Sequence, residues 1–317
     1  MDGTIFLGDI LLPGVQETLC HLRSLNKQVR FLSNTTIRTR GECRDRLLQL
    51  GLAAHEEEIV TAGFMSAAYF LESHGAVRVL VAGEKALRDE LVSAGVETTD
   101  DPARATHVLV GMDREFDYGK LHRAMKAVRN GAQLIAANPD PNCPVAGDLI
   151  PDTWSMVKAI EAASMGTVGE VIGKPSAYFA AKVLEWSGTS GDRCLMIGDR
   201  LDTDIVFGVS HGMRTALVLT GVASLGDLEQ FPVMPDLSGP RWTNCLGRPG
   251  RFETAGPNLT AFLPGANHGN KRVCYSGRNA GPYMCEFKKS AFQHRLNNLY
   301  KRRFFRTPIY EIWRRLT

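Results

Sequence analysis

The sequence predicts an α/β protein built on a doubly wound, parallel sheet. Short apolar runs rich in β-branched residues alternate along the chain with segments whose apolar residues recur every three or four positions. Strands that alternate with helices in this way form parallel sheets covered by helices. A length of 317 residues, with 44% hydrophobic and 22% charged content, is enough for two ordinary domains with buried cores.

The periodicity of the apolar residues places the strands and helices. The segments predicted as strands are 29–32, 77–81, 107–110, 133–136, 194–197 and 216–219. The segments predicted as covering helices include 15–25, 42–50, 120–129 and 177–186. Because ligands bind such sheets at the carboxyl ends of the strands, the residues directly after each strand are the first candidates for a functional site.

Charge divides the chain into two unlike parts. Residues 1–237 contain 22 Lys and Arg against 31 Asp and Glu, whereas residues 238–317 contain 15 against 3. We therefore predict that residues 238–317 form a separate basic tail, flexible or unrelated to the body, and that the acidic body does not bind nucleic acid. Binding of the tail to an anionic membrane or RNA is an alternative, because aromatic residues are interleaved with its basic ones.

The sequence shows no sign of export or membrane insertion. No apolar run approaches the roughly 20 residues that cross a bilayer, and the first residues lack a basic stretch followed by an apolar one. The seven cysteines are scattered and include no CxxC pair, which is typical of reduced thiols. These features predict a cytoplasmic protein.

Two short motifs at strand ends are suited to bind phosphate. Ser33 and Asn34 follow the predicted strand 29–32, where a hydroxyl and adjacent backbone N–H groups can contact an anion. The alternative is a helix N-cap. Lys174 lies in a Gly-Lys-Pro sequence, where its charge can neutralise a phosphoryl group. The alternative is an ordinary surface lysine.

Three carboxylates follow the predicted strand 194–197. Asp199, Asp202 and Asp204 lie within six residues and repel one another unless a cation compensates them. Magnesium is suited to this, since it prefers oxygen ligands and takes one or two carboxylates besides water and phosphate oxygens. The alternative is a helix start, with Asp202 as the N-cap, Asp204 near the positive end of the helix dipole and Gly212 as the terminator.

The four motifs together resemble one known family. In chain order they are Asp2-Gly3-Thr4, Leu32-Ser33-Asn34, Gly173-Lys174-Pro175 and the stretch from Gly198 to Asp204. This order resembles the haloacid dehalogenase (HAD) superfamily. The neighbouring sequences GDILLPGVQETL, FLSNTTIRTR, ANPDPNCP and ALVLTGVASL are similar to its subfamily IIA, which contains NagD-like phosphatases, p-nitrophenylphosphatases and pyridoxal phosphatase. Taken alone, Asp2-Gly3 would be read as a turn.

The resemblance implies a role for each motif. Asp2 would be the general acid and base, and it would also face Mg²⁺, the implied cofactor, through its backbone carbonyl. Asp199 would bind the metal with Asp204 behind it, and Asp202 would support them. Ser33, Asn34 and Lys174 would bind the phosphoryl group. The attacking aspartate would stand one position before Met1, and the central strand that leads to it would precede the 317 residues.

The resemblance also implies how the chain is divided. A Rossmann-like core would comprise residues 1–76 and 170–237, with an inserted α/β cap at 77–169 and the basic tail after it. Asn138, Asp140 and Cys143 of the cap would contact the leaving group and set substrate specificity. Their alternative is a proline-rich surface turn. Cys143 stands where pyridoxal phosphatases carry a histidine, and a homo-oligomer through the cap is compatible with the family.

Two functions from different classes follow. The first is a magnesium-dependent phosphatase that hydrolyses small phosphate monoesters, such as sugar phosphates or similar metabolites, through an aspartyl-phosphate intermediate. The second is a non-catalytic fragment or phosphate-binding pseudoenzyme. The feature that separates them is the nucleophilic aspartate, which the 317 residues do not contain at the expected place.

Overall fold

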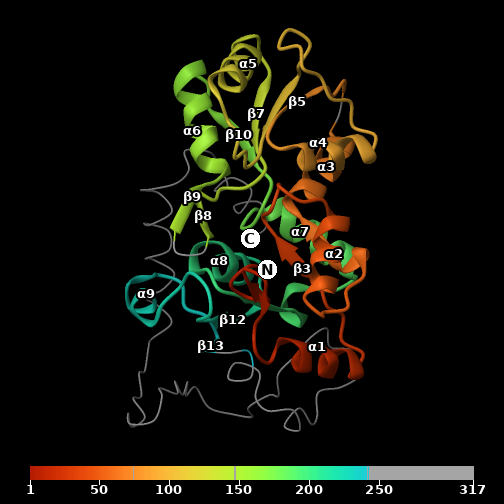
Figure 1. Cartoon of the computed structure of the whole chain (residues 1–317), viewed down its shortest axis with the longest axis vertical. Coiled ribbons are helices and arrows are strands. Elements are labelled where there is room, and N and C mark those ends of the chain that lie inside the picture. Colours follow the sequence, from red (N-terminus) through yellow and green to blue (C-terminus); the bar gives the residue numbers. More distant parts are fainter. Residues whose placement is uncertain (74, 146–147, 241, 243–317) are drawn as a thin grey trace, which may run out of the picture. The chain divides into compact units, whose positions relative to one another are not determined.

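The structure, a computed structural model that describes residues 1–73, 75–145, 148–240 and 242, has the predicted α/β architecture (Figure 1). These residues belong to the first, Met1–Gly265, of the two units into which the chain divides. Two parallel sheets form the core. The pairs and their order are β3 (Phe31–Ser33) with β4 (Ile59–Thr61), and β11 (Leu195–Gly198) with β12 (Arg214–Val218) and β13 (Leu237–Gly239).

Helices and one hairpin surround these strands. The helices are α1 (Val15–Ser24), α2 (Arg40–Gln49), α3 (Ala62–Glu72), α7 (Ala177–Ser187), α8 (Val206–Ser210) and α9 (Leu225–Gln230). The hairpin near the N-terminus is β1 (Phe6–Leu7) with β2 (Ile10–Leu11). A π-helical turn, Leu201–Ile205, leads from β11 into α8, and short 3₁₀ helices cover Glu56–Glu58 and Gly191–Arg193.

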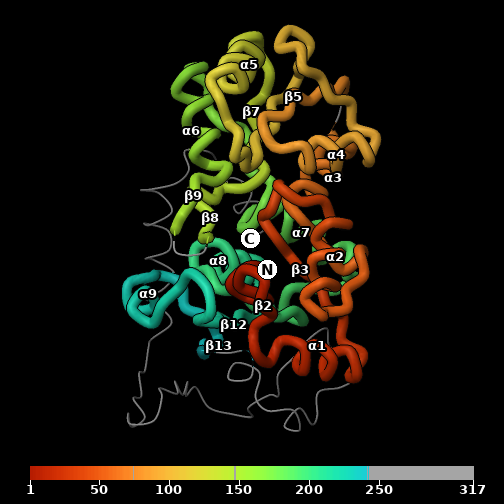
Figure 2. The backbone as a smooth tube through the Cα atoms, viewed as in Figure 1, coloured from red at the N-terminus to blue at the C-terminus, as the bar shows by residue number. Residues whose placement is uncertain are grey.

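The middle of the chain forms a second α/β layer, here called the cap. Its parallel sheet has the order β10 (Val168–Val171), β7 (Gln133–Ala136), β6 (His107–Val110) and β5 (Val79–Ala82). Its helices are α4 (Lys85–Ser93), α5 (Tyr118–Arg129) and α6 (Thr153–Ser164), and its antiparallel hairpin is β8 (Asn142–Val145) with β9 (Asp148–Pro151). Figure 2 shows that this middle segment, orange to light green, is inserted between chain segments that form the core.

The cap and core share buried apolar residues. One cluster includes Leu109 and Ile135 from the cap sheet together with Phe179 of α7 and Phe207 of α8. The three residues Val108–Val110 are all buried in β6, as expected for a parallel strand that is covered on both faces. The cap is therefore packed onto the core and not merely tethered to it.

Neither β3 nor β11 has a partner on its second edge among the described residues. β3 pairs with β4 alone, and β11 pairs with β12 alone. A cavity of about 140 Å³ touches both strands, and its walls include Phe31, Leu32, Leu195 and Ile197.

The boundary predicted at Leu237 is wrong. β13 pairs in parallel with β12 through Ser238 and Gly239, and Trp242 is 4% exposed. The Trp242 indole packs in the core cluster that contains Phe31, and its Nε1 donates a hydrogen bond of 2.6 Å to the carbonyl of Thr4. The boundary was placed too early because it was based on the change in charge, and charge indicates only which residues are exposed to solvent. Residues 238–242 pack onto the core through strand β13 and the Trp242 indole. The predicted tail from residue 243 lies outside the described residues.

The predicted elements are all present, and some strands were missed. Segments 107–110 and 133–136 have the predicted bounds. β4 was missed because it is only three residues long, and β10 because Gly169 and Glu170 interrupt its apolar pattern at the edge of the sheet. β10 also extends the cap sheet to Val171, two residues beyond the predicted end of the cap.

We predict that Trp242→Ala lowers the free energy of unfolding by about 3–5 kcal/mol, because a buried indole and its hydrogen bond are lost. Trp186→Ala, which removes an indole that is 39% exposed, is the matched control and should cost clearly less. Urea denaturation of the three proteins measures both effects. Equal losses for the two variants would contradict the assignment of Trp242 to the core.

Candidate active site

The Asp2-Gly3-Thr4 turn lies directly against Asp199, 195 or more residues later in the chain. Thr4 Oγ1 donates a hydrogen bond of 2.7 Å to Asp199 Oδ1. A Cβ added to Gly3, which has a φ of +71°, would lie 2.4 Å from Asp199 Oδ2. Only glycine fits there, both for its backbone conformation and for the close approach. Asp2 itself is exposed.

A third segment holds the other side of Asp199. The backbone N–H of Val222 donates to Asp199 Oδ2 at 3.0 Å, and Thr220 Oγ1 donates to the carbonyl of Gly3. Thr220 follows strand β12, so the rule that selected the other motifs, polar residues directly after a strand, also points to it. Val222 contributes a backbone N–H, for which its side chain gives no signal. Neither residue was among the predicted site residues, because Thr-Gly-Val carries no charged group.

Lys174 is buried beside Asp204. Its Nζ lies 2.6 Å from Asp204 Oδ1, and only 5% of the residue is exposed. Nζ also donates at 3.5 Å to the carbonyl of Leu32, on the edge of β3 that lacks a partner strand. The alternative of an ordinary surface lysine is therefore wrong. A buried ammonium group remains charged only when oxygen atoms compensate it, and Asp204 does so here.

Asp204 accepts hydrogen bonds with both oxygens. Its Oδ2 receives the backbone N–H groups of Asp199 and Arg200, at 3.2 and 3.3 Å. Burial alone would raise the pKa of Asp204, but the charge and hydrogen bond of Lys174 hold that pKa below its ordinary value. Asp204 therefore carries its negative charge in the folded protein and orients the lysine.

Asp199 has the opposite electrostatic situation. Burial and then the neighbouring charge of Asp204 raise the pKa of Asp199 above its ordinary value. Its hydrogen-bond donors, Thr4 and Val222, are neutral groups. A carboxylate in this position gains from a nearby cation.

The donor set fits a hard divalent cation. Two buried carboxylates, Asp199 and Asp204, lie beside the backbone of the Asp2–Thr4 turn, and magnesium needs only one or two carboxylates besides carbonyl, water or phosphate oxygens. In the described part of the chain no group of three or more His, Cys, Asp and Glu side chains could hold a metal. A metal held by these two carboxylates would take further ligands from backbone, water or phosphate oxygens.

Asp202 lies away from this pair. Its side chain is 53% exposed and accepts hydrogen bonds from Arg200, with Nη2 at 2.9 Å. The helical turn begins after Arg200, so Asp202 lies inside it and the alternative with Asp202 as N-cap is wrong. Gly212, with a φ of +72°, does follow the end of α8.

Ser33 and Asn34 stand at the end of β3 beside Lys174. Ser33 is 9% exposed, and its Oγ accepts a hydrogen bond from the N–H of Thr35 at 3.2 Å. The alternative of a helix N-cap is wrong for both residues, because α2 begins at Arg40 and Thr39 is its N-cap. Asn34 Oδ1 accepts a hydrogen bond from the backbone N–H of Lys174 at 2.9 Å.

The predicted cap residues lie at two different depths. Asn138 and Asp140 are 1% and 9% exposed, so a surface turn is the wrong description for them. Asn138 Nδ2 donates to the carbonyl of Asn34 at 2.7 Å, and Asp140 Oδ2 accepts from Asn34 Nδ2 at 3.0 Å. Cys143, on β8, is partly exposed and is the predicted cap residue with the easiest access to a ligand.

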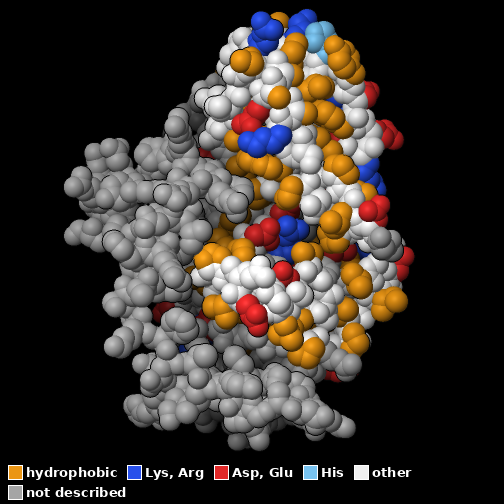
Figure 3. Space-filling view, turned by 90° about the vertical axis from the view of Figure 1, so that its left-hand side faces the viewer, with side chains coloured by type: hydrophobic (Ala, Val, Ile, Leu, Met, Phe, Trp, Pro, Cys, Tyr) orange, Lys and Arg blue, Asp and Glu red, His pale blue; other side chains and the backbone are white. Residues whose placement is uncertain are grey.

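Charges from the cap and core meet around Cys143. Burial raises the pKa of the Cys143 thiol to about 11, and the charges of Asp152, Asp2 and Asp140 act in the same direction. Burial also raises the pKa of Asp140 to about 6, against the opposing charge of Arg200 and the hydrogen bond from Asn34. In the space-filling view, acidic and basic side chains lie next to one another at about mid-height of the face turned toward the viewer (Figure 3).

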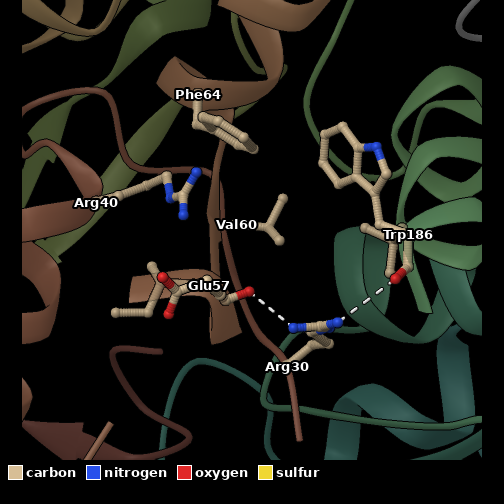
Figure 4. A pocket seen from close by; sticks show the side chains of 8 residues that line it. Arg30, Arg40, Glu57, Val60, Phe64 and Trp186 are labelled. Atoms are coloured by element: carbon tan, nitrogen blue, oxygen red, sulfur yellow. Dashed lines mark hydrogen bonds between the residues drawn. The ribbon is translucent and has the colours of Figure 1, made fainter. Parts of the chain in front are cut away.

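A second cavity, of about 240 Å³, contains none of the predicted site residues. The Arg40 guanidinium lies 4.0 Å from the centroid of the Phe64 ring, and that ring lies 5.4 Å from Trp186 (Figure 4). Arg30 donates to the carbonyls of Glu57 and Trp186. Arg40 Nη2 donates to the carbonyl of Glu56, whereas Arg40 Nε is buried without a hydrogen-bond partner among the described residues. The cavity lies between α3, β4 and α7.

Comparison with known proteins gives consistent matches. Residues 1–97 match the family described as haloacid dehalogenase-like hydrolase, and residues 171–241 match the description HAD-hydrolase-like. The sugar-phosphatase AraL of Bacillus subtilis (strain 168) is 35% identical over 236 residues, which cover 74% of this chain and 86% of that relative.

Solved structures resemble the chain over a similar length. A 4-nitrophenylphosphatase from Thermotoga maritima superposes with a TM-score of 0.73 and 32% identity, covering 77% of this chain and 93% of that one. A glycerol phosphate phosphatase from Mycobacterium tuberculosis, solved in complex with magnesium, has a TM-score of 0.71 and 28% identity, covering 87% and 80% of the two chains.

We predict that Asp140→Asn gains stability relative to the wild type as the pH rises. The folded-state pKa of Asp140 is raised to about 6, so its contribution to stability is fully present below the ordinary value and is lost as the pH rises through 6. Between about pH 4 and pH 8 the difference in unfolding free energy should shift by about 2–3 kcal/mol toward the variant. Urea denaturation across that range measures it, and a constant difference would contradict the prediction.

Proposed function

Because the chain belongs to the haloacid dehalogenase-like hydrolase family, in its NagD-like subfamily IIA, and is by family a phosphomonoester hydrolase, we propose that it is a magnesium-dependent phosphatase of small metabolites. The substrates are sugar phosphates or similar monoesters, in line with the names of its relatives. One observation carries the proposal. The buried Lys174–Asp204 pair, Asp199 and the Asp2–Thr4 turn converge at one end of the core.

Each residue at this end has a part in phosphoryl transfer. Lys174 neutralises charge on the phosphoryl oxygens, and the Ser33 hydroxyl and the backbone N–H of Asn34 bind them. Asp2 donates a proton to the leaving oxygen as its bond to phosphorus breaks. The same carboxylate then removes a proton from the water that attacks phosphorus, which releases inorganic phosphate.

A metal ion would compensate the negative charge of the phosphoryl group. Mg²⁺ would be held by Asp199 and the backbone carbonyl of Asp2, with Asp204 in support. When bound, it supplies positive charge to the phosphate oxygens. The raised pKa of Asp199 supports this, because burial and the charge of Asp204 leave that carboxylate in need of a cation. Asp204 keeps its own compensation from Lys174.

The covalent step needs an aspartate that attacks phosphorus and forms an aspartyl-phosphate. We place it one position before Met1, at the end of a strand between β3 and β11. The unpaired edges of these strands and the cavity of about 140 Å³ between them support this place. A non-catalytic fragment or phosphate-binding pseudoenzyme is the alternative for the 317 residues as they stand.

The proposal also covers the cellular location and the oligomeric state of the protein. We place the enzyme in the cytoplasm, consistent with free thiols at each of the four described cysteines, Cys20, Cys43, Cys143 and Cys194. No helix within the described ranges is long and apolar enough to cross a bilayer. A homo-oligomer through the cap stays a prediction.

We predict that p-nitrophenyl phosphate is hydrolysed negligibly by the 317 residues and readily by a form that carries an apolar strand ending in Asp before Met1. In the extended form, Asp2→Asn should lower kcat by about 10²–10⁴, because the general acid is lost, and Asp199→Asn should abolish the dependence on magnesium. Release of inorganic phosphate with and without magnesium measures all four proteins.

Two outcomes would contradict the proposal, one for the place of the nucleophile and one for the enzymatic activity. Comparable, Asp199-dependent turnover by the unextended chain would show that the nucleophile lies elsewhere. An extended form that folds but releases no phosphate from any ester would favour the pseudoenzyme.

We predict that Cys143 influences the choice of substrate more than the rate with a small ester. Cys143 is the partly exposed member of the proposed specificity residues, and the charge of Asp2 acts on its thiol. Remote groups of a substrate, rather than its phosphoryl end, meet such a side chain. In the extended form, Cys143→Ala should change kcat/KM unevenly across a panel of sugar phosphates, with p-nitrophenyl phosphate as the reference. A uniform loss across the panel would contradict a role in specificity.

A further inference from the structure

The side chain of Asn34 is fully occupied by hydrogen bonds within the protein. Its Nδ2 donates to the carbonyl of Lys174 and to Asp140 Oδ2, both at 3.0 Å, and its Oδ1 accepts from the N–H of Lys174 at 2.9 Å. A primary amide has two N–H donors, and both are used. The carboxylate and carbonyl require the nitrogen on one side, and the N–H requires the oxygen on the other, so one orientation of the amide satisfies all three contacts.

The amide of Asn34 therefore binds both the backbone N–H and the backbone C=O of Lys174, which belong to the two peptide groups on either side of its Cα. This holds the backbone of the lysine, while Asp204 holds its ammonium group at 2.6 Å. A Cβ added to Gly173 would lie 2.9 Å from Asn34 Oδ1 and 2.7 Å from the carbonyl of Ala137. The close approach of the two loops therefore depends on glycine at position 173.

Asp140 and Asn138 join this arrangement to the cap. Asn138 Oδ1 accepts from the N–H of Asp140 at 2.9 Å, and Asn138 Nδ2 donates to the carbonyl of Asn34 at 2.7 Å. The segment that carries both residues follows β7, and the Lys174 loop follows β10, which pairs with β7 in the cap sheet. Both loops leave the carboxyl ends of neighbouring parallel strands, which is why they meet.

We propose that Asp140 and Asn34 are positioning residues that fix the orientation of Lys174, with Asp140 acting through the Asn34 amide. Asp140 Oδ2 accepts a hydrogen bond from one of the two Nδ2 hydrogens of Asn34. This contact fixes the plane of the amide that binds the backbone of Lys174. Its other oxygen, Oδ1, is buried and has no hydrogen-bond partner among the described residues, where the hydrogen bond from Asn34 is therefore the contact that orients this carboxylate. The catalytic meaning rests on the proposed function, but the positioning can be measured without any reaction.

The experiment measures the acetylation of individual lysines by an N-hydroxysuccinimide ester, quantified by peptide mass spectrometry. Lys174 is 5% exposed and should react slowly in the wild type, whereas the Lys158 side chain, 56% exposed, is the internal reference. In Asp140→Ala the relative rate at Lys174 should rise about tenfold, the change expected when one charge-assisted hydrogen bond no longer holds the closed position. Asp140→Asn keeps an acceptor oxygen and should restore slow acetylation.

The matched control is Asp113→Ala. Asp113 is a buried carboxylate of the cap, with a side chain 1% exposed, and it pairs with Lys120 at 2.7 Å. This variant should accelerate acetylation of Lys120 and leave Lys174 at its wild-type rate. If Asp140→Ala does not fold, Asn34→Asp takes its place, because it keeps the shape but presents an oxygen to both acceptors and should also expose Lys174.

Two results would overturn the proposal. One is a wild-type rate at Lys174 in a folded Asp140→Ala or Asn34→Asp protein. The other is an equal rise at Lys174 in Asp113→Ala, which would show general loosening of the cap instead of a specific contact. Loss or absence of phosphatase activity in any of these proteins bears on the proposed function and leaves this readout unchanged.

Discussion

The site depends on two buried carboxylates, Asp199 and Asp204, that lie close together and that, among the described residues, bond to one ammonium group. Asp199 and Asp204 are each 5% exposed, and Lys174 bonds to Asp204. Removing charges from water is costly unless they are paired, so this arrangement constrains everything around it. A Cβ at Gly198 would lie 2.2 Å from Asp204 Cβ, and one at Gly221 would lie 2.0 Å from Asp199 Oδ2. The backbone must approach both carboxylates closely to donate its N–H groups.

The two carboxylates consequently have different chemistry, although they lie five residues apart on one turn. Lys174 and two backbone N–H groups keep Asp204 ionised, so this residue orients the lysine. Asp199 has neutral donors and a pKa raised by burial and by its neighbour, so it gains from a cation that arrives from outside the chain. Both residues are buried, but Asp204 has Lys174 as its partner, whereas Asp199 has no such charged partner within the described ranges and is suited to bind a metal.

Lys174 connects the two layers of the fold. Its loop continues from β10 of the cap sheet, yet its ammonium group contacts a residue that follows β11 of the core. The apolar cluster that contains Leu109, Ile135 and Phe207 spans the same junction. The position of the lysine is therefore set by the packing of cap on core as well as by its own loop. In this respect the cap contributes to the end of the core at which Lys174, Asp199 and Asp204 meet.

The sequence by itself determined the α/β class, six of the strands, the main helices and the motifs that converge at the site. These depend on local periodicity and on the rule that parallel strands present their carboxyl ends together, both of which can be read along a chain. Tertiary structure alone decided that Trp242 belongs to the core, that Asp202 faces Arg200, and that the Asn34 amide binds the Lys174 peptide. The Trp242 and Asn34 contacts join segments that lie far apart in the sequence, whereas Arg200 and Asp202 are only two residues apart. In each case no pattern in the sequence encodes which donor an acceptor will meet. The depth of Asn138 and Asp140 was decided in the same way, because the pairing of β7 with β10 buries a segment whose composition is that of a surface turn.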